Sequence, residues 1–131
     1  MVEFARMEIE SAGGTVAADI RVAGSYEVGL IVDRLLANPK IDAVVVLGYI
    51  ERGETLHGEV MGHVVHNALQ QLQLQYKKPV GIGIIGPGAT PEQAQVRKEG
   101  AARGAVSAVV RSLTELEKLS DSQGSVQSDE Q

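Results

Sequence analysis

Two short apolar runs, separated by a segment long enough for a helix, constrain the fold of this chain most. The runs are IDAVVVL at residues 41–47 and VGIGII at residues 80–85, and their β-branched side chains favour buried strands. Between them, residues 58–76 carry apolar side chains at helical spacing, and the KKP sequence at 77–79 ends that helix. A strand, a helix and a second strand in this order form a right-handed crossover, so we expect the two strands to be parallel.

The segments before this unit continue the alternation of strands and helices. The pattern of Thr15–Val22 predicts a third strand, and Val2–Ser11, followed by two glycines at 13–14, predicts a helix before it. Ser25 is expected to cap a helix that ends at Leu36. Together these elements predict an α/β fold in three layers, with helices on both faces of a parallel sheet.

The last helix has the clearest start signal in the chain. From Thr90 to Gln93, a threonine, a proline and a glutamine stand at the positions of a capping box, and the helix that they open should run toward Leu119. The sequence after it, SDSQGSVQSDEQ, has no apolar periodicity. We therefore expect one domain over residues 1–119 and a disordered polar tail over residues 120–131.

Composition narrows the class of protein. The chain has 131 residues with 44% hydrophobic and 3% aromatic content, enough for one domain with an aliphatic core. Its net charge of −5 argues against a nucleic-acid partner, since phosphate neutralisation needs a basic face. No apolar run is long enough to span a bilayer, the N-terminus lacks a signal-peptide pattern, and there are no cysteines. We expect a cytoplasmic protein without membrane contact.

Titratable side chains gather after the predicted strands. The connections at residues 24–27, 48–57 and 86–90 each follow a strand, and the second contains glutamates, an arginine, a threonine and a histidine. In parallel α/β sheets, ligands bind outside the carboxyl ends of the strands. The titratable side chains of residues 48–57 are therefore expected to line a ligand site.

The sequence GIGIIG at residues 81–86 matches the glycine pattern of a dinucleotide-binding loop, but its context is wrong. Its first two glycines fall inside a predicted strand, and the next helix begins only at Pro91. We favour glycines that let a helix or another subunit approach the strand.

The three histidines have different expected roles. His63 and His66 share a helix face, but no third ligand at a zinc-site spacing accompanies them, so they are expected to be surface or core-edge residues and no metal is expected. His57 lies in the polar connection, and imidazole exchanges protons near neutral pH.

Residues 53–55, which are Gly53, Glu54 and Thr55, precede a helix and admit two interpretations. Free backbone N–H groups at a helix start favour an anion such as phosphate, whereas Thr55 as a plain N-cap explains the same residues. Arg97 could complete an anion site, although an isolated arginine is usually only solvated.

Taken together, the quoted segments resemble the lumazine synthase family, in particular its short archaeal form. The resemblance is carried by DAVVVLGYIERGETLH, an amphipathic helix, and KPVGIGIIGPGATPEQAQVR, and by AGSYE at residues 23–27. It spans roughly residues 13–119. The family has a flavodoxin-like, three-layer α/β/α fold and condenses 5-amino-6-(D-ribitylamino)uracil with 3,4-dihydroxy-2-butanone 4-phosphate to 6,7-dimethyl-8-ribityllumazine, without a cofactor.

The resemblance implies a role for each matching residue. His57 matches the proton-transfer histidine. The positions that match substrate-binding residues are Ser25, Tyr26, Glu27, Tyr49, Ile50, Glu51 and Ile82. The positions that match the phosphate site are Gly53, Glu54, Thr55 and Arg97. The resemblance also implies a homo-oligomer, a pentamer or a sixty-subunit shell, whose active sites are shared between neighbours.

The chain departs from the family at its start. Family members begin with a strand that lies in the middle of the sheet and carries an aromatic ring against the pyrimidine, and this strand is absent before the helix at Val2–Ser11. Either the start is incomplete, or the remaining strands close up, or another chain fills the position. Two alternatives therefore stay open beside the synthase, a catalytically impaired shell protein of the same fold and an archaeal-type riboflavin synthase.

Overall fold

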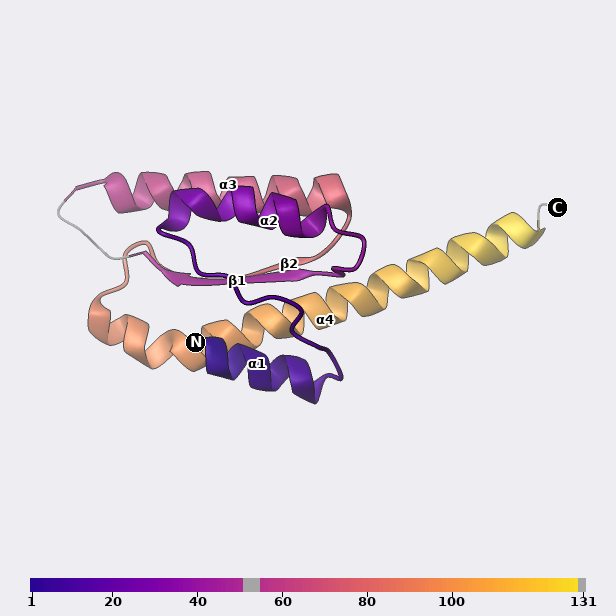
Figure 1. Cartoon of the computed structure of the whole chain (residues 1–131), viewed down its shortest axis with the longest axis horizontal. Coiled ribbons are helices and arrows are strands. Elements are labelled where there is room, and N and C mark those ends of the chain that lie inside the picture. The colour runs from indigo at the N-terminus through magenta and orange to yellow at the C-terminus, as the bar shows by residue number, and fades with distance from the viewer. Residues whose placement is uncertain (51–54, 130–131) are drawn as a thin grey trace.

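A two-stranded parallel sheet forms the middle of the molecule (Figure 1). The computed structural model describes residues 1–50 and 55–129. Strand β1 (Val44–Tyr49) pairs with strand β2 (Val80–Ile85) so that the first residues of the two strands face one another, as do the last. The predicted parallel pairing of the two apolar runs is therefore confirmed.

Helices cover both faces of this sheet. Helix α2 (Val28–Leu36), entered through the 3₁₀ turn η1 (Ser25–Glu27), and helix α3 (His57–Tyr76) lie on one face. Helix α1 (Val2–Ser11) and helix α4 (Pro91–Asp129) lie on the other, and the end of α4 projects away from the body (Figure 1). The predicted α/β class with helices on both faces is confirmed, with a smaller sheet than expected.

The two faces bury different kinds of side chain. Between the sheet, α2 and α3 the core is built from larger aliphatic groups, among them Leu36, Val46 and Leu69. Between the sheet, α1 and α4 the small side chains of Ala5 and Ala102 lie at the centre, and larger ones surround them. Small side chains let helices approach closely, so the α1–α4 layer lies close to the sheet.

Polar contacts fix the ends of α2 and α3. The Tyr76 hydroxyl donates to Asp33 Oδ1 at 2.7 Å, and this hydrogen bond, with some desolvation, raises the pKa of Tyr76. The Lys78 ammonium donates to the carbonyl oxygens of Leu36 and Asn38, at 2.9 and 3.1 Å. Because these are carbonyl groups at the end of α2, Lys78 acts as a C-terminal cap.

The glycines of β2 allow α4 to lie directly on the strand. A Cβ atom at Gly81 would overlap the Ala105 carbonyl oxygen and come within 2.8 Å of Val109 Cγ2, and one at Gly83 would lie 3.0 Å from the Ala101 carbonyl oxygen. The interpretation of these residues as close-packing glycines, rather than as a nucleotide loop, is thus supported.

We expect Gly81→Ala to destabilise the fold by about 1–3 kcal/mol, because the strand and the backbone of α4 cannot both keep their places. Gly104→Ala is the matched control. Gly104 is an exposed residue within α4 with nothing within 4 Å of an added Cβ, so this change should stabilise the helix by about 0.5–1 kcal/mol. Urea denaturation of both variants measures the difference, and equal effects would contradict the packing account.

The predicted strand at Thr15–Val22 is wrong. These residues form no regular secondary structure and no backbone hydrogen bond within the described chain, and Ile20 and Val22 remain 49% and 36% exposed. A cavity of about 700 Å³ separates them from β1. A strand needs a neighbour for its backbone groups, and no described strand lies beside this segment.

Several boundaries also differ from expectation, among them the start of α3, which is His57 rather than residue 58. Strand β1 covers Val44–Tyr49 rather than 41–47. Ser25 does not cap a helix with its side chain, because the 3₁₀ turn precedes α2 there. Helix α4 continues to Asp129, beyond Leu119, and the division into a domain of residues 1–119 and a disordered tail stays a prediction.

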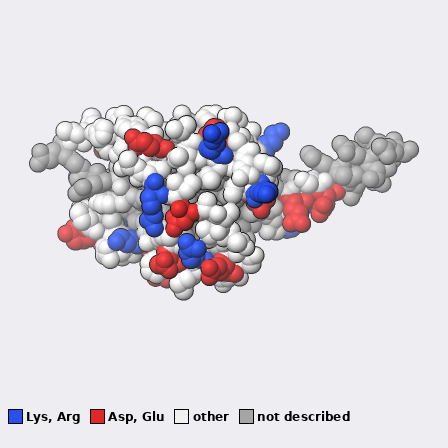
Figure 2. Space-filling model, in the orientation of Figure 1, with Lys and Arg blue, Asp and Glu red and all other residues white. Residues whose placement is uncertain are grey.

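Charged side chains of both signs lie interspersed on the face drawn in Figure 2. The described residues of this face thus form no continuous basic surface of the kind that nucleic acids require. Among the helices that the structure describes, none is both long and apolar enough to cross a bilayer.

Candidate active site

Both strands end at the same edge of the sheet, and three connections meet there (Figure 1). We call this the ligand edge; its described residues are 24–27, 48–50, 55–57 and 86–90. Turn η1 packs against α3 at this edge, so the first and second connections are in direct contact. The sequence-based expectation that these connections converge is confirmed for the described residues.

His57 lies at the first position of α3, against η1. Its ring centroid is 6.0 Å from that of Tyr26, with the ring planes at 66°, which is an edge-on contact. The His57 backbone N–H donates to Thr55 Oγ1 at 3.3 Å, but the N-cap of α3 is Leu56 and no side chain caps this helix, so the interpretation of Thr55 as a plain N-cap is wrong. The structure therefore brings together the predicted proton-transfer residue and one predicted substrate-binding residue.

Tyr49, the last residue of β1, and Ile50, which follows it, differ in exposure. The Tyr49 hydroxyl donates to the Ala89 carbonyl oxygen at 3.1 Å, while its side chain stays partly exposed. Ile50 is only 1% exposed, and its N–H donates to the Ile85 carbonyl oxygen at 2.8 Å. Tyr49 is accessible to a ligand, whereas Ile50 forms part of the core below it.

Ser25 and Glu27 lie in η1, close to Gly24. Ser25 is half-buried at the start of the turn. A Glu27 carboxylate oxygen lies 3.0 Å from where a Cβ of Gly24 would be, so this carboxylate folds back over the turn. Both residues belong to the ligand edge, as predicted from the topology.

Four predicted site residues need separate mention. Glu51, Gly53 and Glu54 lie outside the described residues. Ile82 lies in the middle of β2, opposite Val46, and packs against the core cluster under α2 and α3. Within this chain, Ile82 is therefore not at the ligand edge.

The start of α4 is fixed by a reciprocal cap. The Gln93 N–H donates to Thr90 Oγ1 at 3.2 Å, and the Thr90 N–H donates to Gln93 Oε1 at 3.0 Å. The predicted capping box is confirmed. Arg97 follows in the second turn, is exposed, and forms no ion pair with any residue that the structure describes. Its guanidinium is available to an anion.

Replacing Thr90 by alanine should destabilise the protein by about 1 kcal/mol, because the Gln93 amide loses its side-chain acceptor at the helix start. Thr90→Ser keeps the hydroxyl and should stay within about 0.5 kcal/mol of the original chain. Thermal or urea unfolding of the two variants tests this. Similar losses in both would show that the threonine methyl group, and not the cap, matters.

Arg103 is engaged in the α1–α4 contact. Its Nη1 lies 2.6 Å from Glu8 Oε2 and its Nε lies 2.9 Å from Glu99 Oε1, and these two hydrogen bonds raise the pKa of Arg103. Its guanidinium also lies over the Phe4 ring, 5.7 Å from the centroid. With two carboxylate partners, Arg103 is less suited to an anion site than Arg97.

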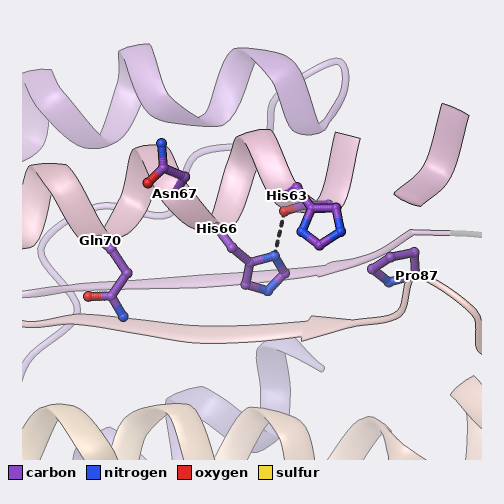
Figure 3. Close-up of a pocket in the computed structure, with 6 residues that line it drawn as sticks. His63, His66, Asn67, Gln70 and Pro87 are labelled. Carbon is purple, nitrogen blue, oxygen red and sulfur yellow. Dashed lines mark hydrogen bonds between the residues drawn. The ribbon is translucent and has the colours of Figure 1, made fainter. Parts of the chain in front are cut away.

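His63 and His66 line a separate cavity of about 380 Å³ on α3 (Figure 3). His66 Nδ1 lies 2.7 Å from the Gly62 carbonyl oxygen; because a carbonyl only accepts, Nδ1 carries the proton. Asn67, Gln70 and Pro87 complete the lining. No set of three or more His, Asp or Glu side chains is arranged for a metal ion in residues 1–50 and 55–129.

One contact of the ligand edge was missed from the sequence. Tyr49 was identified as a site residue, but its hydrogen bond to Ala89, forty residues away, was not. The only local signal is an aromatic residue at the end of a strand, which does not identify a partner. Such a pairing depends on the register between β1 and β2.

Comparison with known proteins identifies the family of this chain. The family model for 6,7-dimethyl-8-ribityllumazine synthase matches residues 1–117. The chain belongs to this family. A relative from Sulfolobus acidocaldarius, named 6,7-dimethyl-8-ribityllumazine synthase, is 40% identical over 119 residues, which are 91% of this chain and 75% of the relative. A protein of the same name from Methanocaldococcus jannaschii is 40% identical over 121 residues, covering 92% of this chain and 85% of the relative.

Proposed function

We propose that this chain is a 6,7-dimethyl-8-ribityllumazine synthase, a transferase of riboflavin biosynthesis. The observation that carries the proposal is the family match over residues 1–117. The proposal is supported by the contact between the Tyr26 and His57 rings, which lies at the edge where β1 and β2 end. The substrates are 5-amino-6-(D-ribitylamino)uracil and 3,4-dihydroxy-2-butanone 4-phosphate.

The steps of this condensation need proton transfer and anion stabilisation. The amine attacks the ketone with loss of water, phosphate leaves by elimination, and the second nitrogen closes the ring with loss of another water. His57 moves protons in these steps, and Arg97 together with the N–H groups near Thr55 binds the departing phosphate. None of the steps changes an oxidation state through an external acceptor, so no redox cofactor is required.

Side chains around His57 and Tyr49 form the binding surface for the pyrimidine and ribityl groups in this proposal. Tyr26 and Tyr49 are 49% and 38% exposed, so both side chains reach the surface of the ligand edge. Ser25 and Glu27 supply polar groups for the ribityl hydroxyls, and Glu51 belongs to the segment that lines the ring pocket.

We also propose that the chain forms a homo-oligomer, a pentamer or a larger shell. Helix α3 exposes Val60 and Val64, at 52% and 49%, one turn apart on the same helix. Leu56, just before the helix, is 69% exposed and continues this stripe. Burying such an apolar stripe against another copy is favourable.

The reaction is tested by incubating the purified chain with both substrates and following lumazine fluorescence. His57→Ala should lower kcat by about 100-fold, at the low end for lost acid–base catalysis. Arg97→Ala should raise KM for the butanone phosphate by about 10- to 100-fold, because a charge-assisted hydrogen bond is lost.

Matched controls are His63→Ala and Arg111→Ala, which remove an exposed histidine of α3 and an exposed arginine farther along α4. Both should leave the rate unchanged, and native mass spectrometry checks the assembly of every variant. An intact oligomer that forms no lumazine would favour the shell protein. If the intact oligomer instead converts lumazine to riboflavin, the chain is a riboflavin synthase. A normal KM in Arg97→Ala would refute the phosphate assignment.

We propose, further, that the cavity beside β1 accommodates a strand. In the family's flavodoxin-like sheet, a strand occupies this central position. The cavity is lined by residues 15–22 on one side and by β1 on the other. In the described chain β1 pairs only with β2, so its second edge offers backbone donors and acceptors to another strand.

Fusing an alternating Val-Thr segment of strand length in front of Met1 should therefore stabilise the protein by at least about 2 kcal/mol, because its valines are buried and its backbone is paired. Slower amide hydrogen exchange in Val44–Leu47 and a higher Tm are the expected readouts. The same segment with prolines at alternate positions should have neither effect. A fusion that leaves exchange in β1 unchanged would mean that the cavity does not accept a strand.

A further inference from the structure

Tyr49 joins the end of β1 to the connection that starts α4. It is the last residue of β1 and lies opposite Ile85, the last residue of β2. Its hydroxyl reaches past the end of β2 and donates to the Ala89 carbonyl oxygen at 3.1 Å. The side chain thus links the strand that leads toward His57 with the connection that leads toward Arg97.

We propose that Tyr49 is a positioning residue, whose hydrogen bond to Ala89 holds the start of α4, and with it Arg97, in place relative to the end of β1. This inference rests on the proposed function, because it assigns Arg97 to the phosphate of the substrate. It concerns the hydroxyl group of Tyr49, while the ring remains part of the ligand surface.

The connection at residues 86–90 is held on the α3 side by Pro87, which packs closely on Gly62, and elsewhere by contacts with the strand ends and the start of α4. At its start, the Ile50 N–H donates to the Ile85 carbonyl oxygen, and Gly86, at φ +90°, leaves no space for a Cβ beside the Ile50 carbonyl oxygen. At its end, Ala89 is 3% exposed and packs with Ile85 and Ala94. Tyr49 adds the one side-chain hydrogen bond from β1 to this segment among the described residues.

The fixed connection determines where α4 begins. Ala89 precedes Thr90, whose hydroxyl and N–H form the capping box with Gln93 and whose carbonyl accepts from Ala94 N–H at 2.9 Å. Arg97 lies six residues after Pro91, roughly 9 Å along the helix axis. A change in the helix start therefore moves the guanidinium, and a misplacement of about 1 Å can cost up to about 100-fold in rate.

Tyr49→Phe tests the proposal, because it keeps the ring and removes only the hydroxyl. Amide hydrogen exchange at residues 88–93 should become about 3- to 10-fold faster, and the affinity for inorganic phosphate, measured by calorimetry, should fall by a similar factor. KM for the butanone phosphate should rise accordingly, while KM for the pyrimidine substrate stays the same. Incorporating 4-aminophenylalanine at this position restores a donor and should reverse these changes.

Tyr76→Phe is the matched control. It also deletes a partly buried tyrosine hydrogen bond, the 2.7 Å bond to Asp33, but at the opposite end of α3. It should leave phosphate affinity and exchange at residues 88–93 unchanged. Equal effects from both variants would mean a general loss of stability and would overturn the proposal.

Two further results would overturn the positioning role of Tyr49. One is that amide exchange at residues 88–93 is unchanged in Tyr49→Phe. The other is that exchange there becomes faster while the affinity for phosphate stays the same. The proposed reaction fails separately. If the original chain forms no lumazine, yet Tyr49→Phe weakens phosphate binding and speeds exchange, the positioning role stands and the synthase assignment does not. If the chain forms lumazine and phosphate affinity does not respond to Tyr49→Phe, only the positioning role is refuted.

Discussion

The contact of the α4 backbone with β2 supports most of the molecule. Without side chains at Gly81 and Gly83, the carbonyl groups of Ala101 and Ala105 lie directly on the strand. Helix α1 then packs on the flank of α4, with Ala5 in the small-residue cluster and Arg103 joining the two helices through Glu8. The N-terminal helix is thus held largely through α4, and α4 through two glycines.

The opposite face reaches the same sheet by different means. Larger side chains such as Leu36 and Leu69 fill the space under α2 and α3, and Tyr76 and Lys78 fix the far ends of these helices. These polar contacts hold the ends of α2 and α3 that are far from the ligand edge. At the ligand edge itself, η1 contacts the start of α3. Packing on both faces therefore determines how the three connections meet.

Local signals in the sequence predicted the elements that depend on local physics. Helix Val2–Ser11 and strand Val80–Ile85 have the predicted bounds, and the capping box from Thr90 to Gln93 forms as the residue types imply. The strand at Thr15–Val22 failed because alternation shows which side chains a strand would bury but not whether a neighbouring strand exists. For the same reason, strand topology predicted that His57 and Tyr26 share an edge, whereas the Tyr49–Ala89 bond depends on the register of two distant segments.

The proposed site depends more on alignment than on any single reacting group. Acid–base catalysis typically contributes 10²–10⁴-fold, about 3–5 kcal/mol, whereas holding reactants in a productive geometry can contribute about 7–11 kcal/mol. His57 starts one helix and Arg97 lies in the second turn of another, so no single rigid element carries both. Their relative position is transmitted through the paired ends of β1 and β2 and the anchored connection at 86–90. Loss of such an anchor can therefore cost as much activity as loss of a group that contacts the substrate, although the anchor itself takes no part in the chemistry.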